Sequence, residues 1–342
     1  MKNSDLKRLA KVASVSETTA YRAISGMAGV SEKTKKRVLD AADALGLDRR
    51  KTRRQSCEAL IGAALPAKPS YFWGTAISAL RQAARAASDL PAGPDVFFSL
   101  FGHLSDEEDI LRSLDDLLDA SVAAHLIVPA ATERILKKTE ACREKAPVVF
   151  LCEHNGMQDA YFVGEDREKS GAMLAEALRV HFPDRRRLLM LQFGDYRCSD
   201  IRSAAFLSGV TGQLEAVKTL SFDGKVPYLA AEIARALYET RKTYPFDTVL
   251  CREGYLPQAC LAVQKLGVKD VICFGFERAG QDSGRYIKSG VLGAYVEQDI
   301  AKEAEAAFSL ALSLAAGETP PAKEIYIPSR LFVGREHLQD AE

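Results

Sequence analysis

The sequence is 342 residues long, which corresponds to two or three domains of ordinary size. Hydrophobic residues make up 47% of the chain and charged residues 27%, which excludes a mostly disordered chain, a collagen-like chain and a small disulfide scaffold. The formal net charge of zero conceals an asymmetry. Residues 1–60 hold 14 Lys/Arg and 7 Asp/Glu, a charge of +7, so the rest of the chain carries −7. Because only the N-terminal part is basic, we expect this part, and not the acidic remainder of the chain, to bind a polyanion.

The seven cysteines and five histidines are scattered and form neither a C-x-x-C pair nor a metal-ligand spacing. We therefore expect reduced, mostly buried thiols in a cytoplasmic protein, without a metal site or cofactor. The N-terminus, MKNSDLKRLAKV, is polar and charged and lacks the apolar segment of a secretory signal. No run of eighteen apolar residues occurs, so no membrane span is expected.

Residues 1–47 have the pattern of three short helices. Ser4 or Asp5 can cap the first helix, Ser16 is a candidate N-cap for the second, and the third starts at Ser31. Two helices joined by a short turn and followed by a third fit a helix-turn-helix, whose second helix enters the major groove of DNA. The alternative is a three-helix bundle with a solvated basic face.

The second predicted helix carries the side chains that can touch DNA. Arg22 is the best candidate to read a base, because a guanidinium pairs with guanine through two hydrogen bonds. The other candidate DNA-binding residues of this segment are Ser16, Glu17, Thr18, Thr19 and Tyr21.

The segment SVSETTAYRAISGMAGVSEKTKKRVLDAADALGL closely resembles the DNA-binding head of the LacI/GalR family of bacterial transcription regulators. The matching positions are Val15, Ser16, Thr19, Arg22, Val30, Ser31, Thr34, Arg37, Val38, Ala42, Leu45 and Gly46. The resemblance implies that Glu17 and Thr18 read bases. It departs from the family pattern where Ser14 replaces a turn glycine and Tyr21 replaces a small serine.

Residues 48–58 form a basic linker that contains DRRKTRRQS. Arg49, Arg50, Arg53 and Arg54 are expected to bind backbone phosphates, although a solvated linker is the alternative. The family has Pro-Asn and a hinge leucine in this region, and both are missing here. Arginines in a narrow minor groove can take the place of leucine intercalation.

From residue 59 onward, short apolar runs alternate with helical patterns. Buried apolar strands separated by helices predict parallel sheets, and two such series predict two doubly wound lobes. Strands are expected at 59–66, 95–102, 125–130, 147–153, 187–194, 216–222, 247–253 and 268–277. Helices are expected near 72–88, 106–119, 132–145, 200–210, 228–241 and 255–266. No phosphate-binding or hydrolase motif occurs, so the chain is not expected to be an enzyme.

Ligands of open α/β sheets bind outside the carboxyl ends of the strands. Aromatic and polar side chains at such positions suit a sugar or another small polar molecule. The candidates are Tyr71, Phe72, Trp73, Asp166, Arg202, Glu253, Glu277 and Gln298. The alternative is that Tyr71 to Trp73 pack as core and that the charged residues cap helices.

The body resembles the periplasmic-binding-protein-like effector domain of the same family. The segments that carry this resemblance are FVGEDREKSG, DIRSAAF, CREGYLPQACLAVQKLG, CFGFE and GAYVEQDIAKEAEAAF. Arg252 and Glu253 stand for Asn and Asp of the family, and Glu277 stands for Asp, which lengthens side chains in the implied pocket. The resemblance implies a DNA-binding domain at 1–47 and an effector-binding and dimerisation domain at 59–334. Within the latter, lobe 1 is expected at about 59–162 plus 299–334 and lobe 2 at about 163–298.

Together, these observations predict a cytoplasmic, homodimeric transcription regulator, a repressor rather than an activator. Its expected partners are a pseudo-palindromic operator in double-stranded DNA and a small-molecule effector such as a sugar. No membrane partner is expected. The alternative is a cytoplasmic small-molecule-binding protein without effector-controlled DNA binding.

Overall fold

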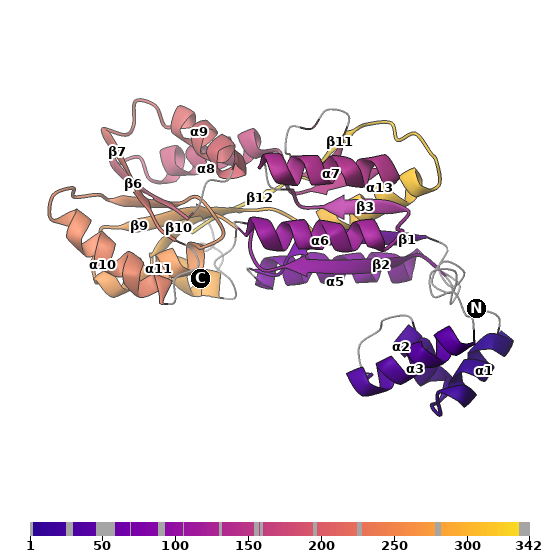
Figure 1. Cartoon of the computed structure of the whole chain (residues 1–342). Coiled ribbons are helices and arrows are strands. Elements are labelled where there is room, and N and C mark those ends of the chain that lie inside the picture. Colours follow the sequence, from indigo (N-terminus) through magenta and orange to yellow (C-terminus); the bar gives the residue numbers. More distant parts are fainter. Residues whose placement is uncertain are drawn as a thin grey trace, which may run out of the picture.

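The computed structural model describes residues 3–24, 30–45, 59–68, 70–87, 93–104, 106–129, 132–153, 157, 160–193, 197–223, 228–277 and 282–334. These residues form three N-terminal helices followed by two α/β lobes (Figure 1). Within the described ranges, no helix has the length and apolar character needed to cross a bilayer.

The three predicted N-terminal helices are confirmed as α1 (Asn3–Val12), α2 (Glu17–Ile24) and α3 (Glu32–Ala44). They pack around a small core of alanines and larger side chains, in which Leu9 and Val38 are fully buried. The predicted caps of the first helix are wrong, because α1 begins at Asn3 and therefore includes Ser4 and Asp5.

Helix α1 ends in a turn that contains one residue in the left-handed conformation, Ser14. The backbone N–H of Val15 donates to the carbonyl of Ala10 at 3.0 Å, and the N–H of Ser14 donates to the carbonyl of Lys11 at 3.3 Å. This pair of bonds is a Schellman motif, in which the residue at the Ser14 position needs a positive φ. Ser14 has a φ of 52°, which explains why glycine is favoured at this position.

The predicted N-cap of α2 is confirmed, and Ser31, expected as the first residue of the third helix, instead caps α3, which begins at Glu32. The Oγ of Ser16 accepts from the backbone N–H of Thr19 at 3.1 Å, and the Oγ of Ser31 accepts from the N–H of Thr34 at 3.3 Å. Each hydroxyl satisfies one N–H that has no partner within its helix.

The first lobe is built on a six-stranded parallel sheet in the order β11-β5-β4-β3-β1-β2. Its strands are β1 (Leu60–Pro66), β2 (Asp95–Phe101), β3 (Ala124–Ile127), β4 (Val148–Leu151), β5 (Tyr161–Gly164) and β11 (Glu324–Tyr326). Helices α5 (Ser70–Ala86) and α13 (Ile300–Ala315) pack together on one face. Helices α6 (Glu107–Asp119) and α7 (Glu133–Lys145) cover the other face.

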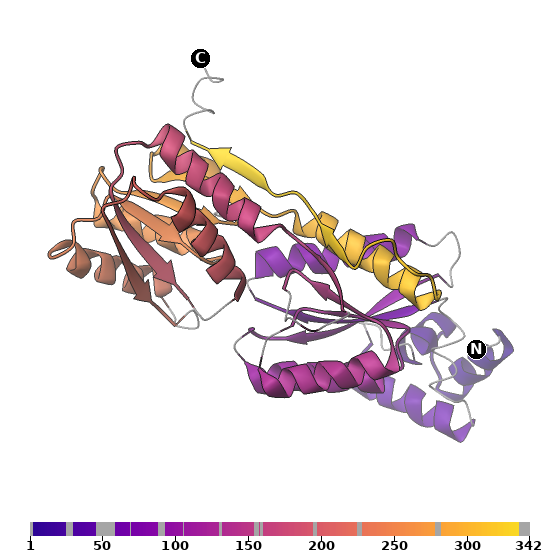
Figure 2. The ribbon, with the colours of Figure 1, turned by 90° about the horizontal axis from the view of Figure 1, so that it is seen from above.

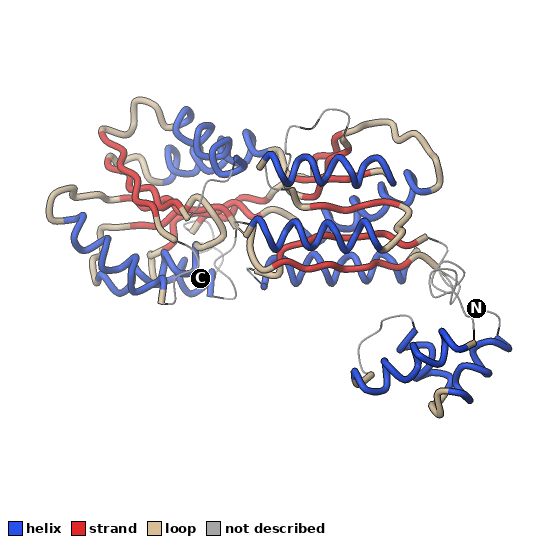
Figure 3. Tube along the Cα trace, in the orientation of Figure 1, coloured by secondary structure: helices blue, strands red, loops and turns tan. Residues whose placement is uncertain are grey.

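The second lobe has a six-stranded sheet in the order β12-β10-β9-β8-β6-β7, in which only the pairing of β12 with β10 is antiparallel. Its strands are β6 (Arg187–Gln192), β7 (Ala216–Ser221), β8 (Thr248–Cys251), β9 (Ile272–Phe276), β10 (Leu292–Glu297) and β12 (Arg330–Val333). Helices α8 (Arg167–His181) and α9 (Arg197–Gly209) cover one face. Helices α10 (Leu229–Arg241), α11 (Leu256–Leu266) and α12 (Ser283–Lys288) cover the other, so both sheets are buried on two sides (Figure 3).

The chain passes between the lobes three times, after β5, after β10 and after β11. Figure 2 shows the last passage as the yellow segment that runs from one lobe to the other. The predicted lobe boundaries are corrected at two places. The expected change of lobe at 162/163 falls inside β5, and β12, expected in lobe 1, pairs with β10 in lobe 2. Two edge strands of three and four residues have no periodic sequence signal long enough to place them.

Gly171 allows α8 and α9 to approach closely. A Cβ at this position would overlap the carbonyl oxygen of Arg202 and lie 2.8 Å from the Cβ of Ala205. Because Gly171 has no side chain, α9 can pack this closely against α8. This packing sets the position of α9 and of Arg202 on it.

Candidate functional site

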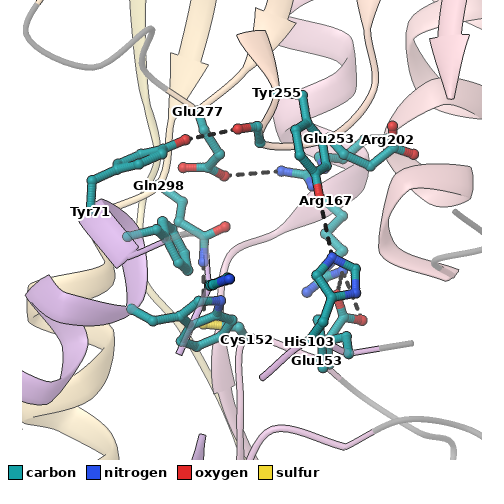
Figure 4. Close-up of a pocket in the computed structure, with 15 residues that line it drawn as sticks. Tyr71, His103, Cys152, Glu153, Arg167, Arg202, Glu253, Tyr255, Glu277 and Gln298 are labelled. Carbon is teal, nitrogen blue, oxygen red and sulfur yellow. Dashed lines mark hydrogen bonds and ion pairs between the residues drawn. The ribbon is translucent and has the colours of Figure 1, made fainter. Parts of the chain in front are cut away.

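A cleft lies where the carboxyl ends of the two sheets face each other (Figure 4). Its cavity volume is about 110 Å³. Seven of the eight side chains that the sequence singled out for a ligand line it: Tyr71, Phe72, Trp73, Arg202, Glu253, Glu277 and Gln298. The strand-end rule therefore placed these residues correctly at one cleft, whereas their role toward a ligand stays a prediction.

Asp166 is the exception. Its carboxylate accepts from the backbone N–H of Lys169 at 3.0 Å and caps α8, and its side chain is exposed rather than in the cleft. Its neighbour Glu165 is 2% exposed and lies behind the cleft wall. Sequence periodicity could not separate the two, because both follow β5 directly and the chain is leaving the sheet there.

The aromatic residues at the start of α5 divide between the cleft and the core. Tyr71 is 37% exposed, and its hydroxyl donates to the carbonyl oxygen of Gly254 in the other lobe at 3.0 Å. Trp73 is 5% exposed, lines the cleft and also packs in the core of lobe 1, where it meets the ring of Phe72 edge-on at 4.9 Å. The alternative that these residues pack as core thus holds for Trp73 in part, because its side chain contacts both the core and the cleft.

Arg202 is held between two buried carboxylates. Its Nη1 donates to Glu165 at 2.9 Å and to Glu277 at 3.3 Å, and its guanidinium lies 4.8 Å from the centre of the Phe276 ring. Burial raises the pKa of Glu277 to about 8, because Arg202 opposes but does not cancel the desolvation and the repulsion from Glu165 and Glu303. Glu277 also has a φ of 68°, a costly conformation for a residue with a side chain.

A second buried cluster forms the floor of the cleft. Gln298 donates to Oε2 of Glu303 at 2.9 Å, and the thiol of Cys152 donates to the same oxygen at 3.2 Å. Burial raises the pKa of Glu303 to about 8. Gln298 follows β10 and Cys152 follows β4, so this cluster joins a crossing between the lobes to the end of a strand in lobe 1.

Glu165 connects the cleft wall to two of the crossings. Its Oε2 accepts from the hydroxyls of Ser170 at 2.6 Å and Ser329 at 2.9 Å, while its Oε1 accepts from Arg202. Ser329 belongs to the crossing that follows β11, and Glu165 itself lies in the crossing after β5. Arg202 is therefore connected through Glu165 to two segments that cross between the lobes.

Glu253 and Arg252 point in different directions at the end of β8. Glu253 accepts from the backbone N–H of Phe193 at 3.1 Å and lines the cleft. Arg252 donates to Gln192 at 2.6 Å and pairs with Asp200, so the expectation of Arg252 in the pocket is wrong. Successive residues of an extended segment point to opposite sides, which explains the difference.

Five further residues that the sequence patterns did not indicate also line the cleft: His103, Cys152, Glu153, Arg167 and Tyr255. His103 and Tyr255 form a second contact between the lobes, with 3.1 Å between Nε2 and the hydroxyl. The signal for Cys152 and Glu153 was present, since they end the strand predicted at 147–153.

The profile of the periplasmic binding protein domain family matches residues 61–319. The chain belongs to this family. A search of curated proteins returns no match.

Solved structures share the fold of this periplasmic binding protein domain at low sequence identity. A protein from Bacteroides fragilis described as a LacI transcriptional regulator is 13% identical, with a TM-score of 0.72 over 83% of this chain and 99% of that one. A carbohydrate transporter solute binding protein from Agrobacterium radiobacter, in complex with D-arabinose, is 16% identical, with a TM-score of 0.69 over 81% and 94%. An ABC transporter solute binding protein from Bacillus halodurans with bound myo-inositol is 18% identical, with a TM-score of 0.69 over 83% and 98%.

The predicted DNA-binding residues lie outside the periplasmic binding protein domain. Ser16 and Glu17 are exposed at the start of α2, where Ser16 also contacts the hydroxyl of Thr19 at 2.8 Å. Thr18, Tyr21 and Arg22 lie within α2, and their side chains are outside the described part of the chain. The linker residues Arg49, Arg50, Arg53 and Arg54 are also outside it.

Proposed function

We propose that this protein is a cytoplasmic, sequence-specific transcription repressor whose affinity for DNA is controlled by a small polar metabolite such as a sugar. The observation that carries the proposal is the combination of a basic three-helix unit with a periplasmic binding protein domain on one chain. The helix pattern of residues 14–47 resembles the LacI/GalR head in its sequence, and residues 1–60 carry a charge of +7.

In this proposal, the three helices form a helix-turn-helix head, and two heads of a homodimer bind the halves of a pseudo-palindromic operator. Helix α2 enters the major groove, and the linker arginines bind phosphates. No catalytic role is assigned to the cleft.

The ligand acts by changing the relative stability of two arrangements of the lobes. The contacts of Tyr71 with Gly254 and of His103 with Tyr255 close the cleft, and Glu165 links it to the crossings. Coupling between the ligand and DNA of about 1–3 kcal/mol is the usual range for such systems. The arabinose and inositol in the neighbouring structures support a polyhydroxylated ligand.

The test begins with selection of binding sequences from random duplexes by the full-length protein at low ionic strength. The recovered site is then titrated with the protein by fluorescence anisotropy, with random duplex as competitor. A preference for the recovered site supports a sequence-specific regulator. Equal affinity for every duplex refutes it and favours a small-molecule-binding protein without effector-controlled DNA binding.

Replacing Arg22 with alanine tests the orientation of the head. The variant should lose about 1–3 kcal/mol of affinity and relax specificity at one base pair, because a bidentate contact to guanine is lost. Arg235→Ala, which removes an exposed charge from α10 in lobe 2, is the matched control. An equal loss on all sequences would assign Arg22 to a phosphate instead.

A further inference from the structure

The lining of the cleft combines aromatic rings with carboxylates. Tyr71, Phe72 and Trp73 come from lobe 1 and Tyr255 comes from lobe 2. Glu153, Glu253 and Glu277 line the same cleft, and Glu165 and Glu303 lie directly behind it. Aromatic faces and carboxylates are the groups that attract an organic cation.

The buried cations of the cleft already face carboxylates of the protein. Arg167 donates to Glu153 at 3.3 Å, and Arg202 donates to Glu165 and Glu277. Among the described residues, both buried arginines of the cleft therefore already face glutamates, and Lys68, which also lines the cleft, is exposed. An anionic ligand would have to compete with these carboxylates for the same arginines, which argues against an acid as the ligand.

Two further features, at Arg202 and Glu277, indicate polar contacts with a ligand. Among the described residues, Nε of Arg202 is a buried donor without an acceptor, and a ligand oxygen would supply one. Glu277 keeps its strained backbone at a φ of 68° while its side chain lines the cleft. Strain of this kind is retained where a side chain must be held in one place.

We propose that the ligand of this cleft carries an ammonium group on a hydroxyl-bearing skeleton, which is the chemistry of an amino sugar. The inference rests on the proposed role of the cleft as the effector site and makes the effector class narrower. The ammonium contacts Glu277 and the aromatic wall, and the hydroxyls meet Arg202 and Gln298.

The electrostatics of Glu277 give a readout that is specific to a cation. The charged and titratable groups that act on its pKa or line the cleft with it are Arg202, Glu165, Glu303, Glu153, Glu253, Arg167, Lys68, His103, Cys152, Tyr71 and Tyr255. Because its pKa is about 8, Glu277 is mostly protonated near neutral pH. A bound ammonium lowers this pKa, so binding releases a proton, whereas a neutral sugar leaves the proton in place.

The experiment uses the full-length protein and matched pairs of ligands. Isothermal titration calorimetry near neutral pH compares D-glucosamine, D-galactosamine and D-mannosamine with the parent sugars and the N-acetylated derivatives. At least one amine should bind tenfold or more tightly than its parent and its N-acetyl form. Repetition in buffers of different ionisation enthalpy should show proton release for that amine alone.

Glu277→Gln should reduce the preference for the amine over its parent sugar at least tenfold and remove the proton release. The matched control is Glu305→Gln, which removes an exposed carboxylate from α13 and should keep the preference. Thermal unfolding of both variants verifies that they fold.

Parent sugars that bind as tightly as the amines overturn the inference, and so does a panel in which no amine binds. Neither result affects the proposed regulator, because operator selection is measured without a ligand. Conversely, the protein could bind an amine and prefer no DNA sequence. That result would support the amino sugar as the ligand class and refute the proposed role as a sequence-specific regulator.

Discussion

Replacing Ser14 with glycine should stabilise the N-terminal three-helix unit. Ser14 occupies the left-handed position of the Schellman motif with a φ of 52°, and this conformation costs a residue with a Cβ about 1–2 kcal/mol. Glycine removes that cost but has more conformational entropy in the unfolded chain, which offsets about 0.5–1 kcal/mol. The net gain in the free energy of unfolding of this unit should be about 0.5–1 kcal/mol.

Hydrogen exchange of the full-length protein measures this gain locally. Protection of the slowest amides in α1 to α3 should rise about two- to fivefold, because 1.4 kcal/mol corresponds to a factor of ten. Ser14→Ala retains the Cβ and should give no gain. Ser121→Gly, at a second exposed serine with a positive φ of 50°, should affect the first lobe and leave these helices unchanged. Equal protection in Ser14→Gly and the wild type, or the same gain in Ser14→Ala, would refute the assignment of strain to this residue.

Three other substitutions test the helix cap, the close helix contact and the buried acid. Ser16→Ala should lower the protection of α2 by about 1 kcal/mol through loss of its N-cap, and Ser16→Asp should retain most of it, as hydrogen exchange can show. Gly171→Ala should lower the free energy of unfolding, measured in urea, by about 1–3 kcal/mol. It should also weaken ligand binding, because α9 must move together with Arg202. A variant with wild-type stability and binding would contradict the tight contact. Glu303 binds its proton more tightly in the folded state, with a pKa of about 8, so its stabilising effect is present at low pH and is lost as the pH rises toward 8. Glu303 should therefore contribute a decline in the free energy of unfolding of as much as about 1.4 kcal/mol per pH unit between roughly pH 5 and pH 8. In urea unfolding, Glu303→Gln should lose this contribution and retain that of Glu277.

The alternation of apolar runs and helical patterns predicted β1 to β4 and β6 to β9, and strands such as β1 and β8 read as apolar runs because they are buried on two faces. It did not predict β5 and β10 as strands, although both lie inside their sheets. The same argument fails for β11 and β12. These edge strands are short and half exposed. Their pairing depends on where the chain crosses from lobe 1 to lobe 2 for the last time, between β11 and β12.

The cleft was predictable as far as it follows from strand ends. Arg202, Glu253, Glu277 and Gln298 all line it as the strand-end rule and the family resemblance predicted. The buried role of Glu165 was not predictable, because it depends on a serine more than 160 residues away in the sequence, Ser329. Contacts of this kind arise from the crossings, which no local pattern encodes.

The distribution of the first lobe over distant segments has a consequence for biosynthesis. Helix α13 packs on α5, and Phe308 and Ala304 complete a core that includes Leu80. At roughly 5–20 residues per second, a ribosome needs on the order of 10–50 s to make the chain between these two helices. During that interval the apolar side of α5 is not covered by α13. The three N-terminal helices have already emerged by then, and the described residues of their core all come from residues 9–45. The nascent chain is thus most exposed to aggregation and proteolysis at α5 while its middle third is being synthesised, and a chaperone that binds apolar segments would have its greatest effect during that interval.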